Sequence, residues 1–328
     1  MNVKPLRIGT RDSVLATWQA RHVEEILKVS GLPAELHYIK TEGDRVLDTP
    51  LPMMGGKGVF TKALDDALLN GDIDLAVHSF KDIPTRMPEG LMVGAVSRRE
   101  DVSDVFISRK SASRDRIDLK PHPKEPPAFL DNPGYRGVIA SSSNRRIGQW
   151  LSRYPNFRIA DIRGNIQTRL RKLVESDWDG AIFAAAGLKR LGLDHHIDWE
   201  LDWMLPAPAQ GAMAVMVRTD DHRTKEAVLP VHDPDAALCT GIERDVLHTL
   251  EGGCSAPVGA FAEIRNDVVD LKVNTVYPDG SGLIAFAMNE EREKAGGLGR
   301  RAADEALRRG ADALIRDLRE GRNSPGAS

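Results

Sequence analysis

The stretch Asp74-Leu75-Ala76-Val77-His78-Ser79-Phe80-Lys81-Asp82-Ile83-Pro84 runs from an apolar segment into a turn and places an acid beside a base where that segment ends. A short apolar run bounded by turn residues is typical of a buried strand in a parallel sheet. Open α/β sheets carry their sites at the carboxyl ends of such strands. The stretch therefore predicts an α/β fold with site residues at Lys81 and Asp82.

The residues around this stretch alternate between strand and helix patterns. A strand at 6–9 is followed by a helix that Ser13 can cap. Further strands are predicted at 35–41, 73–77 and 91–96, with a helix at 60–69. This βαβ order is typical of a doubly wound sheet, so residues 1–100 are predicted to form a first α/β lobe.

A second α/β lobe is predicted over residues 101–211. Its strands are expected at 104–108, 138–140, 157–162 and 180–185, and the proline-rich, charged segment 110–134 is expected to be a solvated loop. The last three strands each lead into a helix. Free backbone N–H groups and the positive end of the helix dipole make such helix starts favourable for anions.

The pattern changes after the turn sequence at 206–211. An apolar strand at 212–217 is expected to return to the first lobe, so that residues 212–230 belong with 1–100. A helix at 235–250, three strands within 258–288 and a helix at 300–318 predict a small α+β domain over 231–328. Two lobes joined by crossing segments imply a hinged cleft.

The composition is that of a globular chain long enough for two or three domains. Hydrophobic residues make up 41% and charged residues 28% of the 328 residues, and no stretch approaches the roughly 18 apolar residues of a membrane span. The N-terminus shows no signal-peptide pattern, so a cytoplasmic protein that binds no membrane is expected. The net charge of −3 argues against nucleic-acid binding, which needs a broadly basic surface.

The two cysteines form no disulfide framework and match no metal-binding spacing, so no metal is expected. Cys239 falls in the helix predicted at 235–250 and is expected to be packed. Cys254 follows Gly252-Gly253, which predicts a thiol on a loop that a bulky partner can approach. The alternative for Cys254 is the role of a small buried hydrophobic residue.

Arginines outnumber lysines by 31 to 14. A GC-rich coding sequence explains the surface arginines as well as function does, so each position is judged separately. A guanidinium binds a carboxylate through two parallel hydrogen bonds, so arginines near the junctions of strands and helices predict a site for several carboxylates. These arginines are Arg11, Arg145, Arg146, Arg163, Arg169 and Arg190.

Five short motifs, in order over nearly the whole chain, resemble the porphobilinogen deaminase family, also called the hydroxymethylbilane synthases. The resemblance implies two lobes like those of type II periplasmic binding proteins and a third domain that presents the cysteine. Five motifs in register are far more specific than any single one. They are Gly9-Thr10-Arg11, Gly55-Gly56-Lys57-Gly58, His78-Ser79-Phe80-Lys81-Asp82, Arg163-Gly164-Asn165 and Gly252-Gly253-Cys254.

The resemblance implies a monomeric transferase of tetrapyrrole and heme biosynthesis. Members of the family carry a dipyrromethane cofactor bound through a thioether to the loop cysteine, which would be Cys254 here. The cofactor acts as a primer to which four porphobilinogen molecules are joined head to tail with loss of ammonia. Hydrolysis then releases the linear hydroxymethylbilane, and no metal is required.

The family motifs imply roles for named residues. Asp82 is the expected catalytic group, because loss of ammonia creates an azafulvenium cation that a carboxylate stabilises, and each new bond releases a proton that a carboxylate accepts. The expected cofactor-binding residues are Cys254, Lys81, Asp82, Ser13, Arg145, Arg146, Ser142, Gly187 and Gln210, with Ser141 as a further hydrogen-bond partner. The expected residues that bind porphobilinogen and the growing pyrrole chain are Arg11, Ser13, Arg163, Arg169, Arg190, Phe60 and Lys57.

Structural alternatives exist for some of these residues. Asp82 could pair with Lys81 or cap the turn before Pro84. Arg169 could be a solvent-facing helix residue, as is expected of Arg171, which matches no family motif.

Lys57 superficially suggests a phosphate-binding loop, but the spacing G-x-x-x-x-G-K-[ST] is absent. The resemblance instead implies a mobile loop at about 41–59, with Phe60 near the cofactor. His78 ends an apolar strand and is expected to be packed with both ring nitrogens satisfied, not to act as a base.

Three residues depart from the family pattern. Asn144 replaces an apolar residue ahead of the paired arginines, Ala63 replaces an acid, and Ala256 replaces a larger aliphatic residue. None of these changes removes a catalytic group, so effects on rate and stability are expected and no change of reaction type.

Two other functions fit parts of the pattern. A non-enzymatic bilobed protein that binds a small carboxylate would use the first two lobes, but it has no use for the cysteine loop. A family member that only binds tetrapyrroles would have no need to keep Asp82, Cys254 and the six motif arginines together.

Overall fold

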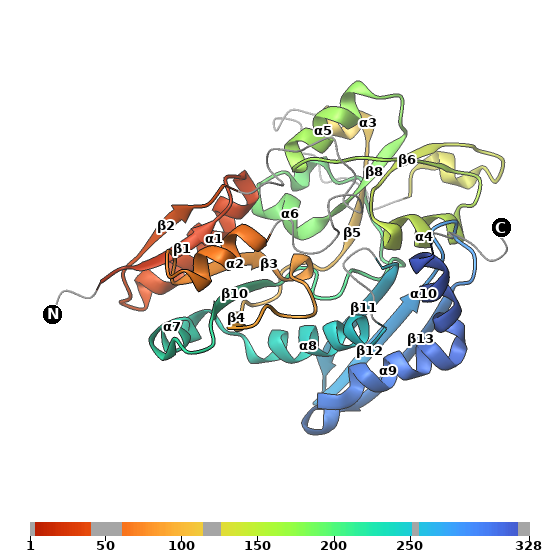
Figure 1. Cartoon of the computed structure of the whole chain (residues 1–328). Helices are drawn as coiled ribbons and strands as arrows, with labels where there is room; N and C mark the ends of the chain where they lie inside the picture. The colour runs from red at the N-terminus through yellow and green to blue at the C-terminus, as the bar shows by residue number, and fades with distance from the viewer. Residues whose placement is uncertain (1–3, 41–60, 114–125, 251–255, 321–328) are drawn as a thin grey trace. The chain divides into compact units, whose positions relative to one another are not determined.

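A computed structural model describes residues 4–40, 61–113, 126–250 and 256–320. The chain divides into two compact units, one of Met1–Glu100 with Ala209–Thr240 and one of Asp101–Pro208 with Gly241–Ser328. Each unit contains a five-stranded mixed sheet, and the second also contains a three-stranded antiparallel sheet (Figure 1). The predicted α/β class is thereby confirmed. No helix in the described ranges combines the length and apolar character needed to cross a bilayer.

The sheet of the first unit incorporates a strand that returns late in the sequence. Its order is β2 (Ala34–Tyr38), β1 (Leu6–Thr10), β3 (Leu75–Ser79), β10 (Met213–Arg218) and β4 (Leu91–Val96). β1 is parallel to both β2 and β3, whereas β10 is antiparallel to β3 and β4. The apolar run at 212–217 therefore becomes an interior strand between β3 and β4.

Helices cover both faces of this sheet because its strands are apolar on both sides. On one face, Val23 and Leu27 of α1 (Val14–Val29) pack with Val77 and with Val228 beyond α7 (His222–Ala227). On the other face, α2 (Lys62–Leu69) and the start of α8 (Pro234–Thr249) pack against the strands through the side chains Leu64, Leu68 and Ala236.

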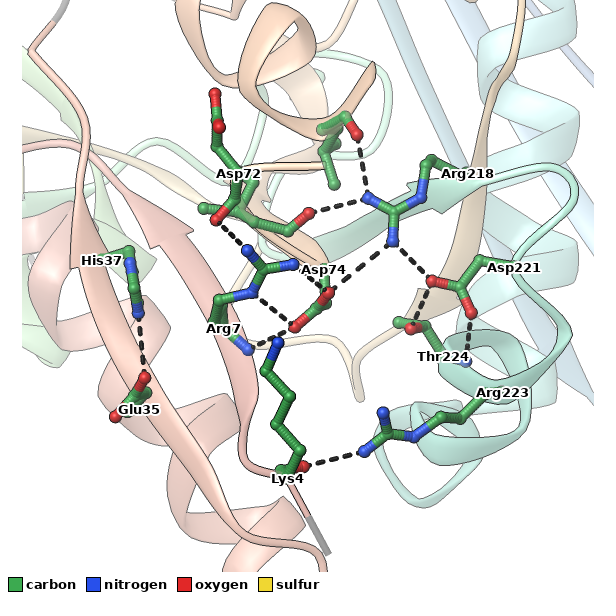
Figure 2. A network of polar contacts seen from close by, with 12 residues as sticks. Lys4, Arg7, Glu35, His37, Asp72, Asp74, Arg218, Asp221, Arg223 and Thr224 are labelled. Carbon is green, nitrogen blue, oxygen red and sulfur yellow. Dashed lines mark hydrogen bonds and ion pairs between the residues drawn. The ribbon is translucent and has the colours of Figure 1, made fainter. Parts of the chain in front are cut away.

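A network of charged side chains lies at the amino-terminal end of β1 and β3 (Figure 2). Arg7 of β1 donates to both carboxylate oxygens of Asp74, at 2.7 and 3.1 Å. Arg218, at the end of β10, pairs with Asp221 at 2.6 Å and donates to the carbonyls of Leu68 and Ile73. The network therefore ties the end of β10 to the neighbouring segments. It lies at the opposite end of the sheet from the carboxyl ends of β1 and β3.

The sheet of the second unit has the order β7 (Arg158–Ala160), β6 (Val138–Ala140), β8 (Gly180–Ala184), β5 (Asp104–Ser108) and β9 (Trp199–Glu200). β6 is parallel to β7 and β8, and β5 is antiparallel to β8 and β9. The helices of this lobe are α3 (Arg109–Ala112), α4 (Asn144–Arg153), α5 (Ile166–Glu175) and α6 (Ala185–Arg190).

The end of the segment at 110–134 contributes to the core of the second unit, so the prediction of a solvated loop was wrong for that end. Phe129, in a 3-10 turn at Ala128–Asp131, packs against Phe106, Tyr135 and Phe157. Trp150 of α4 joins the same aromatic cluster. Aromatic side chains bury large areas, which fixes the end of a segment whose composition alone indicates a loop.

The three-stranded sheet consists of β11 (Val258–Arg265), β12 (Val268–Thr275) and β13 (Ile284–Glu291). Cys239 is buried on α8, as predicted. The single helix expected at 300–318 is instead two helices, α9 (Leu298–Ala306) and α10 (Asp312–Arg319). The interruption lies at Gly310, whose φ of 104° no helix interior has.

Candidate active site

In the first unit, one end of the sheet collects the predicted site residues. β1 and β3 run parallel and end at the same edge of the sheet. Arg11 and Ser13, which follow β1, therefore lie at the same edge as Lys81 and Asp82, which follow β3. β10 runs in the opposite direction, and its first residue, Met213, pairs with Ser79 at the end of β3. The segment that leads into β10 therefore reaches this edge too. Topology therefore explains how residues from three distant parts of the chain come together here.

Lys81 lies in a 3-10 turn at Phe80–Asp82 directly after β3. Its Nζ donates to Oε1 of Gln210 at 3.0 Å, and Gln210 is 1% exposed. Gln210 lies between two residues with positive φ, Ala209 at 64° and Gly211 at 92°. A non-glycine residue in that region is strained, and such strain is often found at functional sites.

Asp82 is exposed at the end of the same turn. Within the described residues its carboxylate makes no hydrogen bond or ion pair, and Lys81 donates to Gln210. The structure thus gives no support to the alternative in which Asp82 only caps the turn. A carboxylate that is not held by neighbours remains available to a bound ligand.

Arg11 and Ser13 follow β1. Ser13 caps α1 as predicted, because its Oγ accepts a hydrogen bond from the backbone N–H of Ala16 at 3.2 Å. The side chain of Arg11 is half-buried near His78. Burial, together with the positive charge of Arg11, lowers the pKa of His78 to about 4.

His78 is buried, which agrees with the prediction of a packed histidine. The expectation that both of its nitrogens are satisfied was wrong, because Nε2 has no hydrogen-bond partner among the described residues. A neutral ring fits this environment, since a charged imidazole would be buried next to a guanidinium.

In the second unit, serines connect two neighbouring strand ends. Ser142, after β6, donates from Oγ to the carbonyl of Ile162 at 2.6 Å and accepts from the N–H of Ile162 at 3.0 Å. Ser141 is buried, and its Oγ accepts from the N–H of Ser143. These bonds hold the start of α4 beside the segment that precedes Arg163.

Arg145 and Arg146, in the first turn of α4, share the carboxylate of Asp104. Arg145 Nη1 lies 2.6 Å from Oδ2, and Arg146 donates from Nη2 and Nε to Oδ1 at 2.7 and 3.0 Å. Their side chains are 4% and 8% exposed, and that of Asp104 is 0% exposed. Burial lowers the pKa of Arg145, whereas Asp104 opposes this effect.

Sequence reasoning missed Asp104. The signal was a charged residue as the first residue of the apolar run Asp104-Val105-Phe106-Ile107-Ser108. Such a position is rare without a charged partner, because an isolated buried carboxylate is costly. One carboxylate for two guanidiniums leaves this cluster with an excess of positive charge, which suits an acidic ligand.

Arg163 and Arg169 flank the start of α5. Arg163 Nε pairs with Asp161 at 2.8 Å, and Arg169 Nε donates to the carbonyl of Gly164 at 2.8 Å. Gly164 has a φ of 111°, and Asn165 caps the helix by accepting from the N–H of Thr168. The motif therefore forms a tight turn that brings both guanidiniums to the helix N-terminus.

α6 follows β8 and carries Gly187 and Arg190, both of which are buried. Lys189 Nζ forms an ion pair with Asp101 at 2.7 Å. Burial acts to raise the pKa of Asp101, but hydrogen bonds from Lys189 and Ser103 lower it below its usual value. The parallel strands β7, β6 and β8 thus lead into Arg163, Arg145 with Arg146, and Arg190 at one edge of the sheet.

Three predicted site residues, Lys57, Phe60 and Cys254, lie outside the described residues, as does the predicted loop at 41–59. The departures Ala63 and Asn144 lie in described helices, at the second residue of α2 and the first residue of α4. Among the described residues, no group of three or more His, Cys, Asp or Glu side chains could hold a metal ion.

Similarities to solved structures are weak in both sequence and superposition. The methionine-binding protein MetQ is 14% identical with a TM-score of 0.42, covering 70% of this chain and 91% of its own. A periplasmic substrate-binding protein of an ABC transporter from Coxiella burnetii is 14% identical with a TM-score of 0.39, covering 71% and 95%.

Sequence comparison gives much stronger similarities. The porphobilinogen deaminase from Campylobacter hominis is 39% identical over 320 residues, 96% of this chain and 98% of that protein. The porphobilinogen deaminase from Chlorobium phaeobacteroides is 40% identical over 325 residues, 97% and 99% of the two chains.

Two family models match consecutive parts of the chain. Residues 6–226 match the porphobilinogen deaminase dipyromethane cofactor binding domain, and residues 237–308 match the porphobilinogen deaminase C-terminal domain. The first match includes the carboxylate at Asp82 and all six arginines of the two strand-end clusters. This chain therefore belongs to the porphobilinogen deaminase family.

Proposed function

We propose that this protein is a hydroxymethylbilane synthase, a transferase that condenses four porphobilinogen molecules head to tail. Each condensation forms one carbon–carbon bond and releases one ammonia, and a final hydrolysis consumes one water to free the linear tetrapyrrole. The single observation that carries the proposal is the family match over residues 6–226, which contain the clustered arginines and Asp82.

The residues present fit a dipyrromethane with acidic side chains. Two buried guanidiniums, those of Arg145 and Arg146, share one carboxylate, and Lys81 projects from the end of β3 toward Gln210. When bound, the cofactor supplies a covalent primer with a free pyrrole carbon. Arg145, Arg146, Lys81, Ser13, Ser142, Gly187 and Gln210 are proposed to hold it, with Cys254 as the attachment point.

Asp82 is proposed as the group that moves protons. Its exposed carboxylate can accept the proton displaced at each new carbon–carbon bond and can offset positive charge on an incoming porphobilinogen that has lost ammonia. A carboxylate already paired with Lys81 would be poorer at both tasks. The donation from Lys81 to Gln210 is therefore part of the support for this role.

The remaining arginines are proposed to bind the acetate and propionate groups of porphobilinogen and of the growing chain. Arg163 and Arg169 flank the N-terminus of α5, where the helix dipole also favours a carboxylate. Arg11, Arg190 and Lys57 carry the same proposed role, whereas Phe60 is proposed to bind substrate near the cofactor rings. We further propose a cytoplasmic monomer that binds neither nucleic acid nor membranes.

The first test is the intact mass of the full-length protein after incubation with porphobilinogen. We expect an excess of one dipyrromethane on the wild type and on Cys239→Ser, because Cys239 is buried on α8. Cys254→Ser should carry no such stable adduct. A wild-type protein that gains no adduct would overturn the proposed reaction and favour a non-enzymatic carboxylate-binding protein.

A second variant separates loading from elongation. Asp82→Asn should still gain the dipyrromethane mass but should elongate it roughly 10² to 10⁴ times more slowly, as expected on removal of a general acid or base. Stopped incubations followed by mass spectrometry would count the added pyrrole units. Elongation at the wild-type rate would remove Asp82 from the mechanism.

A further inference from the structure

A buried amide on α4 connects three separate segments of the second unit. Gln149 is 3% exposed and lies one helical turn after Arg145, on the same side of the helix. The roles proposed above make no use of it. A buried side-chain amide is costly unless its donor and its acceptor are both satisfied, so a position that required only packing would favour an apolar residue.

Both ends of the Gln149 amide are used. Nε2 donates to the carbonyl of Leu205 at 3.0 Å, and Oε1 accepts from the N–H of Leu205 at 2.8 Å. Oε1 also accepts from Nδ2 of Asn274, on β12, at 2.9 Å. A side-chain amide can pair with a backbone N–H and C=O together, whereas an ionised carboxylate lacks the donor and an aliphatic side chain lacks both groups.

Leu205 is the point where these contacts reach the arginine pair and the first strand of the small sheet. Its carbonyl also accepts from Arg145 Nη1 at 2.6 Å. The next carbonyl, that of Pro206, accepts from the N–H of Ala260 on β11 at 3.1 Å. The backbone at 205–206 therefore lies between α4 and β11 and is hydrogen-bonded to both.

Close packing at two glycines fixes the distances between these segments. A Cβ on Gly259 would lie 2.4 Å from Asn274 Oδ1 and 2.8 Å from Leu205 Cβ, and one on Gly148 would lie 2.6 Å from the carbonyl oxygen of Tyr277. In β11, Gly259 pairs with Asn274 of β12. Gly259 of β11 is thus packed against Leu205, which is hydrogen-bonded to α4, and Gly148 of α4 is packed against the segment that follows β12.

We propose that Gln149 is a positioning residue for Arg145, with which it shares the carbonyl of Leu205, and thereby for cofactor binding. It holds the first turn of α4, with Arg145, in a fixed register with the start of β11. The inference rests on the proposed function, since that function assigns Arg145 to cofactor binding.

The test compares loading with stability. Full-length apo-protein, made in cells that cannot produce porphobilinogen, is incubated with porphobilinogen, and the dipyrromethane adduct is followed by intact mass. Gln149→Leu and Asn274→Ala, the two bridge variants, each remove the hydrogen bond between Gln149 and Asn274 from one side. Leu173→Ala is the control, because Leu173 is fully buried on α5 in a different core cluster. All are measured at a temperature at which circular dichroism shows them folded.

We expect both bridge variants to gain the dipyrromethane adduct at least roughly ten times more slowly than the wild type, since small misplacements of reacting groups have effects of this size. Leu173→Ala should load at the wild-type rate despite an equal or greater loss of Tm. If Gln149→Leu fails to fold, Asn274→Ala decides, because it removes a single hydrogen bond.

Two results would overturn the inference alone. One is a bridge variant that folds and loads at the wild-type rate. The other is slow loading of all three variants in proportion to their loss of Tm, which would make Gln149 a structural residue only. Failure of the wild type itself to load would instead sink the proposed function and this inference with it.

Discussion

At the scale of single residues, Asp104 changes how the arginine pair is understood. Sequence reasoning assigned Arg145 and Arg146 to ligand carboxylates, yet both already pair with a carboxylate of the protein. Their guanidiniums are therefore held in place before any ligand binds, which reduces the entropy lost on binding. The pair therefore stabilises the fold and is preorganised for the carboxylates that it is proposed to bind.

Removal of Asp104 should be strongly destabilising. Asp104→Ala leaves two buried guanidiniums without their shared partner, so we expect a loss of about 3–5 kcal/mol in the free energy of unfolding. Asp161→Ala is the matched control, because Asp161 pairs with Arg163 but is 60% exposed, and it should cost less than about 1 kcal/mol. Urea denaturation followed by circular dichroism measures both. Equal losses would contradict the structural role of Asp104.

At the scale of elements, the two glycines where α8 meets α9 are expected to respond in opposite ways to the same change. Gly241, inside α8, is exposed, and a Cβ added there meets nothing within 4 Å. Gly241→Ala should therefore stabilise the protein by about 0.5–1 kcal/mol through helix propensity. A Cβ on Gly299, in α9, would lie 2.2 Å from the carbonyl oxygen of Ile242.

Gly299→Ala should accordingly lower Tm, because the clash is with backbone that can move only if α8 and α9 separate. Differential scanning calorimetry of the two variants checks the pair. A rise in Tm for Gly299→Ala, or a fall for Gly241→Ala, would show that the packing of these helices differs from that described.

Most elements could be predicted because periodicity and capping residues agree locally. Ser13 and Asn165 cap α1 and α5, and the apolar runs at 91–96, 104–108 and 138–140 are strands with those same bounds. The break at Gly310 escaped prediction, because a glycine within a helical pattern does not reveal its φ.

Only part of the candidate site could be predicted from the sequence in the same way. The arginines and Asp82 stood out through their position after strands, and the family motifs supplied their roles. Asp104 and Gln149 did not stand out, because their partners lie 41 and up to 125 residues away in the sequence. A hydrogen bond between distant segments leaves no periodic signal in one sequence.

At the scale of the whole molecule, His78 should contribute to the dependence of stability on pH. Its pKa in the folded protein is lowered to about 4 from 6.5. The unfolded chain therefore binds more protons between these values, and stability falls as pH is lowered from about 6.5 toward 4. From pH 7 to pH 5 the expected loss is about 2 kcal/mol.

Denaturation curves at the two pH values test this expectation. His78→Leu should be less sensitive to the change by about the same 2 kcal/mol. An unchanged difference in His78→Leu would mean that other groups account for the loss of stability in acid.

The late return of β10 has a consequence for synthesis on the ribosome. Among the described strands, β4 is hydrogen-bonded to β10 alone, and one edge of β3 has no partner strand until β10 is synthesised. Roughly 120 residues separate the end of β4 from β10, which corresponds to about 6–24 s of translation. All strands of the other five-stranded sheet emerge within that interval, so the lobe that begins second along the chain can finish folding first.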